Sequence, residues 1–135
     1  MRGLRKRRGG VAAVELAVLL PFLAFLFVIA VDWARIFYYS VVVTNCARNG
    51  ALYLSDPAPR STSPYPDVTT AALADAPNLS PTPTVTSTNG SDSAGPYVEV
   101  TVSYPFTTVT NFPGVPANTT LVRTVRMYAA QQYPN

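Results

Sequence analysis

Residues 11–31 read VAAVELAVLLPFLAFLFVIAV, and Glu15 is the only charged residue among them. An α-helix of this length would be about 31 Å long, which is close to the thickness of the hydrocarbon core of a bilayer. A core helix of a small soluble domain is usually shorter and carries a polar stripe along one side. The stretch therefore predicts a transmembrane helix over residues 11–31.

Charged and aromatic residues flank this helix in different ways. Basic residues crowd residues 1–8, and few follow the apolar stretch, which predicts a single-pass membrane protein with its N-terminus in the cytoplasm and an extracytoplasmic C-terminal head. The residues expected at the outer membrane interface are Trp33, Arg35, Tyr38 and Tyr39. A cleaved secretory signal is the alternative, although its apolar region would be unusually long.

The helix is expected to continue beyond the membrane. Pro57 disfavours the helical conformation for Asp56 and predicts the end of the helix there, and Pro21 predicts a kink within the membrane. Three- and four-residue steps predict one apolar face that packs against a small sheet. Its members are Trp33, Phe37, Val41, Thr44, Ala47, Ala51 and Leu54.

The second half of the chain predicts β-structure. Residues 97–106 alternate, so that Val98, Val100, Val102 and Tyr104 share one face. Residues 119–130 predict another strand, whose buried face stays open because each face carries an arginine. A short helix over residues 68–76 and a strand over residues 84–88 are also expected.

Composition and pattern together predict an α+β protein, in which a long transmembrane helix extends into a small antiparallel β-sheet head. The chain divides into five parts. These are a basic leader (1–10), the transmembrane helix (11–31), a helix extension (32–56), a loop region rich in Pro, Ser and Thr (57–95) and the strands of the head (96–135).

Several function classes are disfavoured. The chain has no histidine and one cysteine, Cys46, which removes the commonest general base and the usual zinc ligand sets. It carries no glycine-rich phosphate loop or nucleophile elbow. We therefore expect no enzyme activity, catalytic residue, metal, cofactor or small-molecule substrate. Basic residues are sparse beyond the leader, so no nucleic acid is expected either. Cys46 is expected on a helix face, or else in an intermolecular disulfide.

The junction of leader and helix suggests a mechanism. A carboxylate inside a membrane costs roughly 2.5–3.5 kcal/mol and usually has a partner. If the chain were cut after Gly10, the new α-amine of Val11 would lie one helical turn from Glu15. In a bundle of such helices, Glu15 of one subunit could pair with the amine of the next, and assembly would neutralise both groups. The alternative is a Glu15 that reaches the membrane edge or stays protonated.

The N-terminal half also resembles a known family. The segment GGVAAVELAVLLPFLAFLFVIAVDWARIFYY is similar to the N-terminal signature of TadE-like proteins, which are minor pseudopilins of the tight-adherence (Flp) pilus system and relatives of type IV pilins. The shared features are Gly10, Glu15, Pro21 and the aromatic and basic patch 33–39. The later VTNCARNGALYL is similar to the family pattern Asn-Ala-Ala-Arg-Glu-Gly-Ala-Arg, with departures at Cys46, Asn49 and Leu52.

This resemblance implies cleavage between Gly10 and Val11 by a membrane prepilin peptidase, and a part in building a pilus for surface adhesion. It implies membrane lipid, the peptidase, other pilin or pseudopilin subunits and the pilus assembly platform as partners. Val11 stands where an aromatic residue often follows the cut, which leaves methylation of the new terminus open. The resemblance leaves open whether such a subunit lies in the pilus fibre, at the tip of the fibre or only in the membrane. The alternative function is a signal-anchored single-pass protein with an extracytoplasmic binding head.

Overall fold

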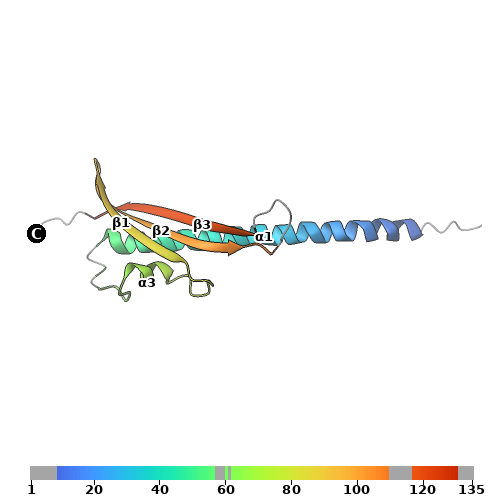
Figure 1. The fold of residues 1–135 in the computed structure, drawn as a ribbon, viewed down its shortest axis with the longest axis horizontal. Helices are drawn as coiled ribbons and strands as arrows, with labels where there is room; N and C mark the ends of the chain where they lie inside the picture. The colour runs from blue at the N-terminus through green and yellow to red at the C-terminus, as the bar shows by residue number, and fades with distance from the viewer. Residues whose placement is uncertain (1–8, 57–59, 61, 110–116, 131–135) are drawn as a thin grey trace, which may run out of the picture.

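The computed structural model describes residues 9–56, 60, 62–109 and 117–130. A long helix α1 (Gly9–Ser55) is followed by a short helix α3 (Val68–Leu73) and three strands, β1 (Thr84–Asp92), β2 (Gly95–Thr107) and β3 (Asn118–Tyr128). The sheet and α3 lie along the C-terminal half of α1, while its N-terminal half projects alone (Figure 1). The α+β architecture predicted from the sequence is confirmed.

The helix α1 is continuous over 47 residues, or about 70 Å. It runs through Pro21 without interruption and ends at Ser55, directly before Asp56 and Pro57, as expected. We call residues 10–31 the stalk and the described residues from Asp32 onward the head. Every stalk residue is exposed except two half-buried residues near its end, Val28 and Ile29.

The three strands form one antiparallel sheet in the order β1-β2-β3. Val102 in β2 pairs with Val85 in β1 and with Arg123 in β3, which makes β2 the central strand. β1 is longer than the strand expected over residues 84–88, and α3 also falls within residues 57–95. The segment expected to be mainly loop therefore contributes a helix and a strand to the head.

The inward face of β2 is the one predicted from its alternation. Val98, Val100, Val102 and Tyr104 are buried, and Phe106 continues the row. In β3 the side chains of Leu121, Val125 and Met127 belong to the core or pack against it, while the alternate residues are exposed. The face of β3 that the sequence left open is thus assigned.

The helix face that meets the sheet differs from the predicted one. Ala47 and Ala51 are fully buried as expected, and Leu54 packs against the core. The other predicted members, Trp33, Phe37, Val41 and Thr44, are exposed, so the first part of the predicted face is wrong. The buried face consists mainly of small residues, because α1 passes close to both β2 and α3. Its fully or largely buried members are Val43, Cys46, Ala47, Gly50 and Ala51.

The short helix α3 covers the other side of this contact. Asp67 caps its N-terminus by accepting a 2.8 Å hydrogen bond from the backbone N–H of Thr70. This bond holds the pKa of the Asp67 carboxyl below its usual value. Ala71 and Ala72 are buried against the core. The small residues of α3 therefore face the small residues of α1.

Candidate functional site

The N-terminal part of the stalk carries the predicted cleavage and pairing residues. Gly10, Val11 and Glu15 all lie on α1 and are exposed. Apart from the backbone of α1 itself, a Cβ added at Gly10 would meet no atom of the described residues within 4 Å. Glu15 makes no hydrogen bond or ion pair with any other residue that the structure describes. The basic residues of the leader, 1–8, lie outside the described residues.

The stalk has the length and composition of a membrane span. It forms the apolar part of the helix that could cross a bilayer, and none of its most apolar 18-residue window is buried within the protein. Large apolar side chains point outward along its whole length, among them Leu16, Phe22 and Phe27. Outside a membrane or an assembly, this surface would remain in contact with water, which is strongly unfavourable.

A buried acid marks the point where the stalk meets the head. Asp32 is 4% exposed and was not singled out from the sequence as a site residue. Its Oδ1 accepts a 3.2 Å hydrogen bond from the Arg35 guanidinium and a 2.9 Å bond from the backbone N–H of Val109. Because Val109 follows β2, this contact joins the end of that strand to α1.

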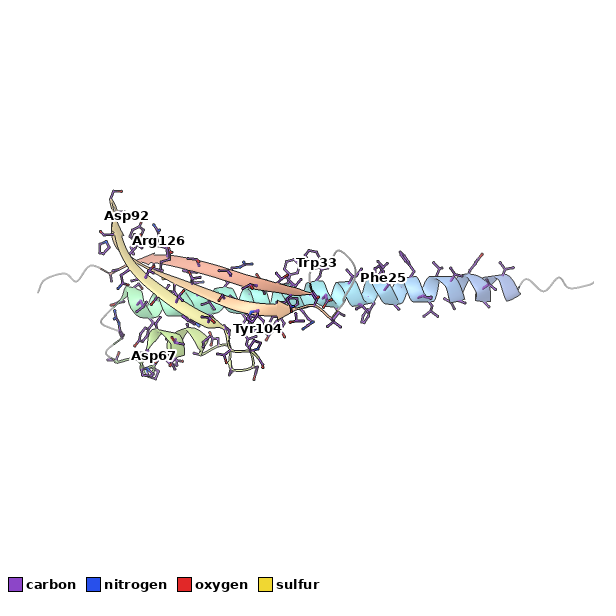
Figure 2. The ribbon with its side chains drawn as sticks, in the orientation of Figure 1. Phe25, Trp33, Asp67, Asp92, Tyr104 and Arg126 are labelled. Atoms are coloured by element: carbon purple, nitrogen blue, oxygen red, sulfur yellow. The ribbon has the colours of Figure 1, made fainter. Side chains whose placement is uncertain are left out.

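Aromatic residues surround this acid, and they divide into two groups. Trp33 and Tyr38, both predicted at the membrane interface, are exposed, and Trp33 lies where the stalk enters the head (Figure 2). Tyr39 instead packs against the sheet, since its ring centroid lies 5.2 Å from that of Tyr104 and 5.6 Å from that of Phe106.

The side chain of Arg35, like that of Tyr39, packs against the head. Its guanidinium carbon lies 5.1 Å from the centroid of the Phe106 ring and 6.0 Å from that of Tyr39. Such contacts between a cation and an aromatic face are attractive and here add to the ion pair with Asp32. Of the four predicted interface residues, Trp33 and Tyr38 therefore remain outward, while Arg35 and Tyr39 bind the head.

Tyr104 completes this junction from the sheet. Its hydroxyl donates a 3.1 Å hydrogen bond to the carbonyl oxygen of Ser80. Burial raises the pKa of the Tyr104 hydroxyl above its ordinary value, since the charged form would lose its hydration. Tyr104 therefore ties the segment before β1 to the underside of β2.

A second polar cluster lies at the opposite end of the sheet, far from the stalk (Figure 2). Arg126 makes ion pairs with Glu99 at 3.2 Å and with Asp92 at 3.6 Å, and its guanidinium carbon lies 3.9 Å from the centroid of the Tyr97 ring. The hydrogen bond to Glu99 raises the pKa of Arg126, and the bond that Tyr128 donates to Asp92 raises the pKa of Tyr128. Arg126, Asp92 and Tyr128 are exposed, while Glu99 and Tyr97 are half-buried. The charged groups satisfy one another, as in a structural surface network.

A cavity of about 720 Å³ lies where α1 ends, between α3 and the end of β3. Its polar side chains pair across it or with nearby backbone. Asn49 donates a 2.7 Å hydrogen bond to Asp75, and the Tyr53 hydroxyl donates a 3.2 Å bond to the carbonyl oxygen of Tyr65. Within the described parts of the chain, no group of three His, Cys, Asp or Glu side chains could hold a metal ion.

Cys46 lies on the face of α1 that packs beneath the sheet. Its side chain is fully buried and belongs to the core formed by α1 and β2. Burial is the largest cause that raises the pKa of its thiol. The expectation of a small residue on a helix face agrees with this position.

These features define a membrane-anchored protein with one apolar N-terminal stalk and a small α+β head. Over residues 10–52, which include the stalk and most of the remaining length of α1, the chain matches the model of the TadE-like protein family. The resemblance inferred from the sequence is thereby confirmed, and it supports a pilus-related protein of the tight-adherence (Tad) system. Proteins of this family are in general not enzymes. No curated protein and no solved structure matches the chain.

Proposed function

We propose that the chain is a minor pseudopilin of the tight-adherence pilus system, and that a prepilin peptidase cleaves it between Gly10 and Val11. The observation that carries the proposal is the family match over residues 10–52, which begins at the proposed cleavage residue and includes Glu15. An accessible Gly10 agrees with it, because a peptidase must reach the peptide bond that it cuts.

Cleavage would supply the partner that Glu15 lacks among the described residues. The α-amine of Val11 would be positively charged and one helical turn from Glu15, yet in a single helix both would remain at the lipid-facing surface. Packing stalks side by side lets Glu15 of one subunit meet the amine of a neighbour. The attraction between the two charges then favours assembly over isolated subunits in the membrane.

The same proposal fixes the topology. The N-terminus lies in the cytoplasm, the stalk spans the bacterial inner membrane, and the head lies outside. The leader residues that support this orientation are basic, and basic residues near a membrane span favour the cytoplasmic side. The proposed partners are the peptidase, other pilin or pseudopilin subunits and the assembly platform, and the proposed role in adhesion is structural rather than enzymatic.

Mass spectrometry of the N-terminus of the protein purified from its native membrane tests the proposal. A chain that starts at Val11 is expected. A start at Val31 would indicate a secretory signal instead, and an intact leader would indicate a plain membrane anchor with a binding head. Either of these two results would overturn the proposed processing.

A further inference from the structure

The exposed apolar surface of the stalk continues past the first charged residue that follows the stalk in the sequence. The first charged residue after Glu15 is Asp32, and Arg35 follows within one turn. Asp32 is 4% exposed and Arg35 is half-buried over the head. Over residues 32–38, the helix surface that faces outward therefore consists of Trp33, Ala34, Phe37 and Tyr38.

The head reaches down to this same level. The backbone N–H of Val109 lies 2.9 Å from Oδ1 of Asp32, so the chain that follows β2 touches α1 at the first turn beyond the stalk. The backbone N–H of Thr108 donates a 3.0 Å hydrogen bond to the carbonyl oxygen of Ala117, which holds the two sides of this connection together. The end of β2 that makes the contact points toward the stalk (Figure 1).

Apolar side chains face outward at this contact. Val109 is 65% exposed, Trp33 is 58% exposed and Phe37 is 65% exposed. We call these three residues the base of the head. Two come from α1 and one from the chain after β2, so this surface exists only in the folded head.

The base also has the right height for a membrane interface. If the hydrocarbon core ends near Val31, Trp33 lies about 3 Å and Phe37 about 9 Å beyond it along the helix. The polar layer on each side of a bilayer is roughly 5–8 Å thick, and tryptophan is enriched in it. Trp33 therefore lies within this layer, and Phe37 lies at its outer boundary. Val109 is held at the level of Asp32 and lies within the same layer.

We propose that the base of the head is a lipid-contacting surface, and that the head rests directly in the interfacial layer of the bilayer instead of standing off from it. The inference rests on the membrane anchoring in the proposed function. A bilayer is favoured over a second copy as the occupant, because the base is continuous with the apolar stalk, with no exposed charged side chain between them. The tilt of the head relative to the membrane would then be fixed by Val109 and Trp33.

Single-tryptophan variants of the full-length protein, with one copy in each lipid nanodisc, test this proposal. Trp33 is the only tryptophan, so Trp33→Phe gives a background without one. In that background Val109→Trp reports on the base. The matched control is Val122→Trp, which is also exposed and pairs with Ser103, four residues or roughly 14 Å along β2 from its end at Thr107.

We expect phosphatidylcholine with a nitroxide near its headgroup to quench the emission of the Val109→Trp variant several-fold more strongly than that of the Val122→Trp variant. The emission of the Val109→Trp variant should also be shifted to shorter wavelength. Quenching of neither residue, with Trp33 of the unsubstituted protein still quenched, would overturn the inference and leave the anchoring intact. Blue-shifted but unquenched emission from the Val109→Trp variant would indicate a protein neighbour and would also overturn it. Equal quenching at both positions would contradict a contact confined to the base.

Loss of quenching at Trp33 as well would instead contradict the membrane anchoring itself.

A second experiment, with a spin label, does not require the protein to tolerate a large side chain at residue 109. Val109→Cys can carry a nitroxide while the fully buried Cys46 stays in place. Its relaxation is expected to be enhanced more by oxygen, which partitions into lipid, than by a water-soluble nickel chelate. The opposite order would overturn the proposal.

Discussion

A Cβ atom at Gly50 would lie 3.0 Å from Cγ1 of Val100, so α1 passes β2 at a distance that leaves no room for a side chain without adjustment. On the other side, the same atom would lie 3.2 Å from Cβ of Ala72 in α3. Gly50 therefore sits between the sheet and the short helix, and its missing side chain brings the three elements together. Substituting it tests how closely the head is packed.

We expect Gly50→Val to lower the free energy of unfolding of the head by about 2 kcal/mol, since overpacking a close contact typically costs 1–3 kcal/mol. Gly50→Ala should cost less, because alanine gains about 1 kcal/mol of helix propensity over glycine. Urea unfolding in detergent micelles, followed by near-UV circular dichroism, measures both. Asn45→Val, on an exposed part of α1, is the control and should change little. A Gly50→Val variant as stable as this control would contradict the close packing.

Much of this architecture could be predicted because it depends on local pattern. The apolar stretch gives the stalk, the residue before Pro57 gives the end of α1, and alternation gives the inward face of β2. The buried face of α1 could not be predicted in the same way. Large apolar residues such as Trp33 and Phe37 suggested one face, while the close approach of the sheet selected smaller residues around Gly50.

The junction between stalk and head was missed for a different reason. The hydrogen bond between Asp32 and Val109 joins residues that are 77 positions apart, and it is made by a backbone N–H that has no sequence signature. The local ion pair of Asp32 with Arg35, at 3.2 Å, has a three-residue spacing on a helix and is the kind of contact that a sequence can suggest. Long-range contacts such as that of Asp32 with Val109 depend on the register of the whole sheet.

The Asp32 contact predicts a local change in hydrogen exchange. Asp32→Ala leaves the backbone N–H of Val109 without this acceptor, and a hydrogen bond to a charged group contributes about 1.5–3 kcal/mol. Exchange of the Val109 amide should therefore become about tenfold faster or more. Asp32→Asn keeps an oxygen acceptor and should have a smaller effect.

Hydrogen exchange with mass spectrometry or NMR detection measures the Val109 change in micelles. Glu99→Ala is a control, because it removes an acid from the exposed Arg126 cluster at the far end of the sheet and leaves Asp32 in place. If Asp32→Ala and Glu99→Ala gave the same exchange rate at Val109, the contact would have no stabilising role.

Cys46 gives a prediction about covalent pairing between subunits. Its side chain is fully buried and burial raises the pKa of its thiol, so we expect almost no reaction with maleimide in the folded protein and complete reaction after unfolding. Asn45→Cys, one residue earlier on an exposed part of α1, should be labelled quickly. Dimers linked through Cys46 on non-reducing gels of native membranes would contradict the buried assignment and support the intermolecular disulfide.

The proposed cleavage predicts that bulk at Gly10 slows processing. Apart from the backbone of α1 itself, no atom of the described residues lies within 4 Å of an added Cβ there, so Gly10→Leu should leave the helix and its insertion unchanged, and any delay arises at the peptidase. Pulse-chase labelling in cells that express the peptidase measures the loss of the leader. Ala17→Leu also introduces a leucine, about two turns further along the exposed stalk, and should be processed normally. Normal processing of Gly10→Leu would count against this cleavage site.

Glu15 allows insertion and assembly to be separated. Removing a carboxylate from a membrane helix favours insertion by roughly 2.5–3.5 kcal/mol, so Glu15→Ala should enter the membrane at least as well as the natural chain. It should fail to join the pilus machinery, because the α-amine of Val11 on the neighbouring subunit then has no partner. Glu15→Gln keeps the shape and loses the charge, and should fail in the same way.

Co-purification with other pilus subunits from cross-linked membranes measures this recruitment, and carbonate extraction of the same membranes measures insertion. Leu16→Ala truncates the next side chain of the stalk, which is also exposed, and should be recruited normally. This control separates loss of the charge from loss of stalk surface. Normal recruitment of Glu15→Ala would remove the pairing of Glu15 with the amine as a reason for assembly, whereas equal loss in Glu15→Ala and Leu16→Ala would assign recruitment to stalk packing in general.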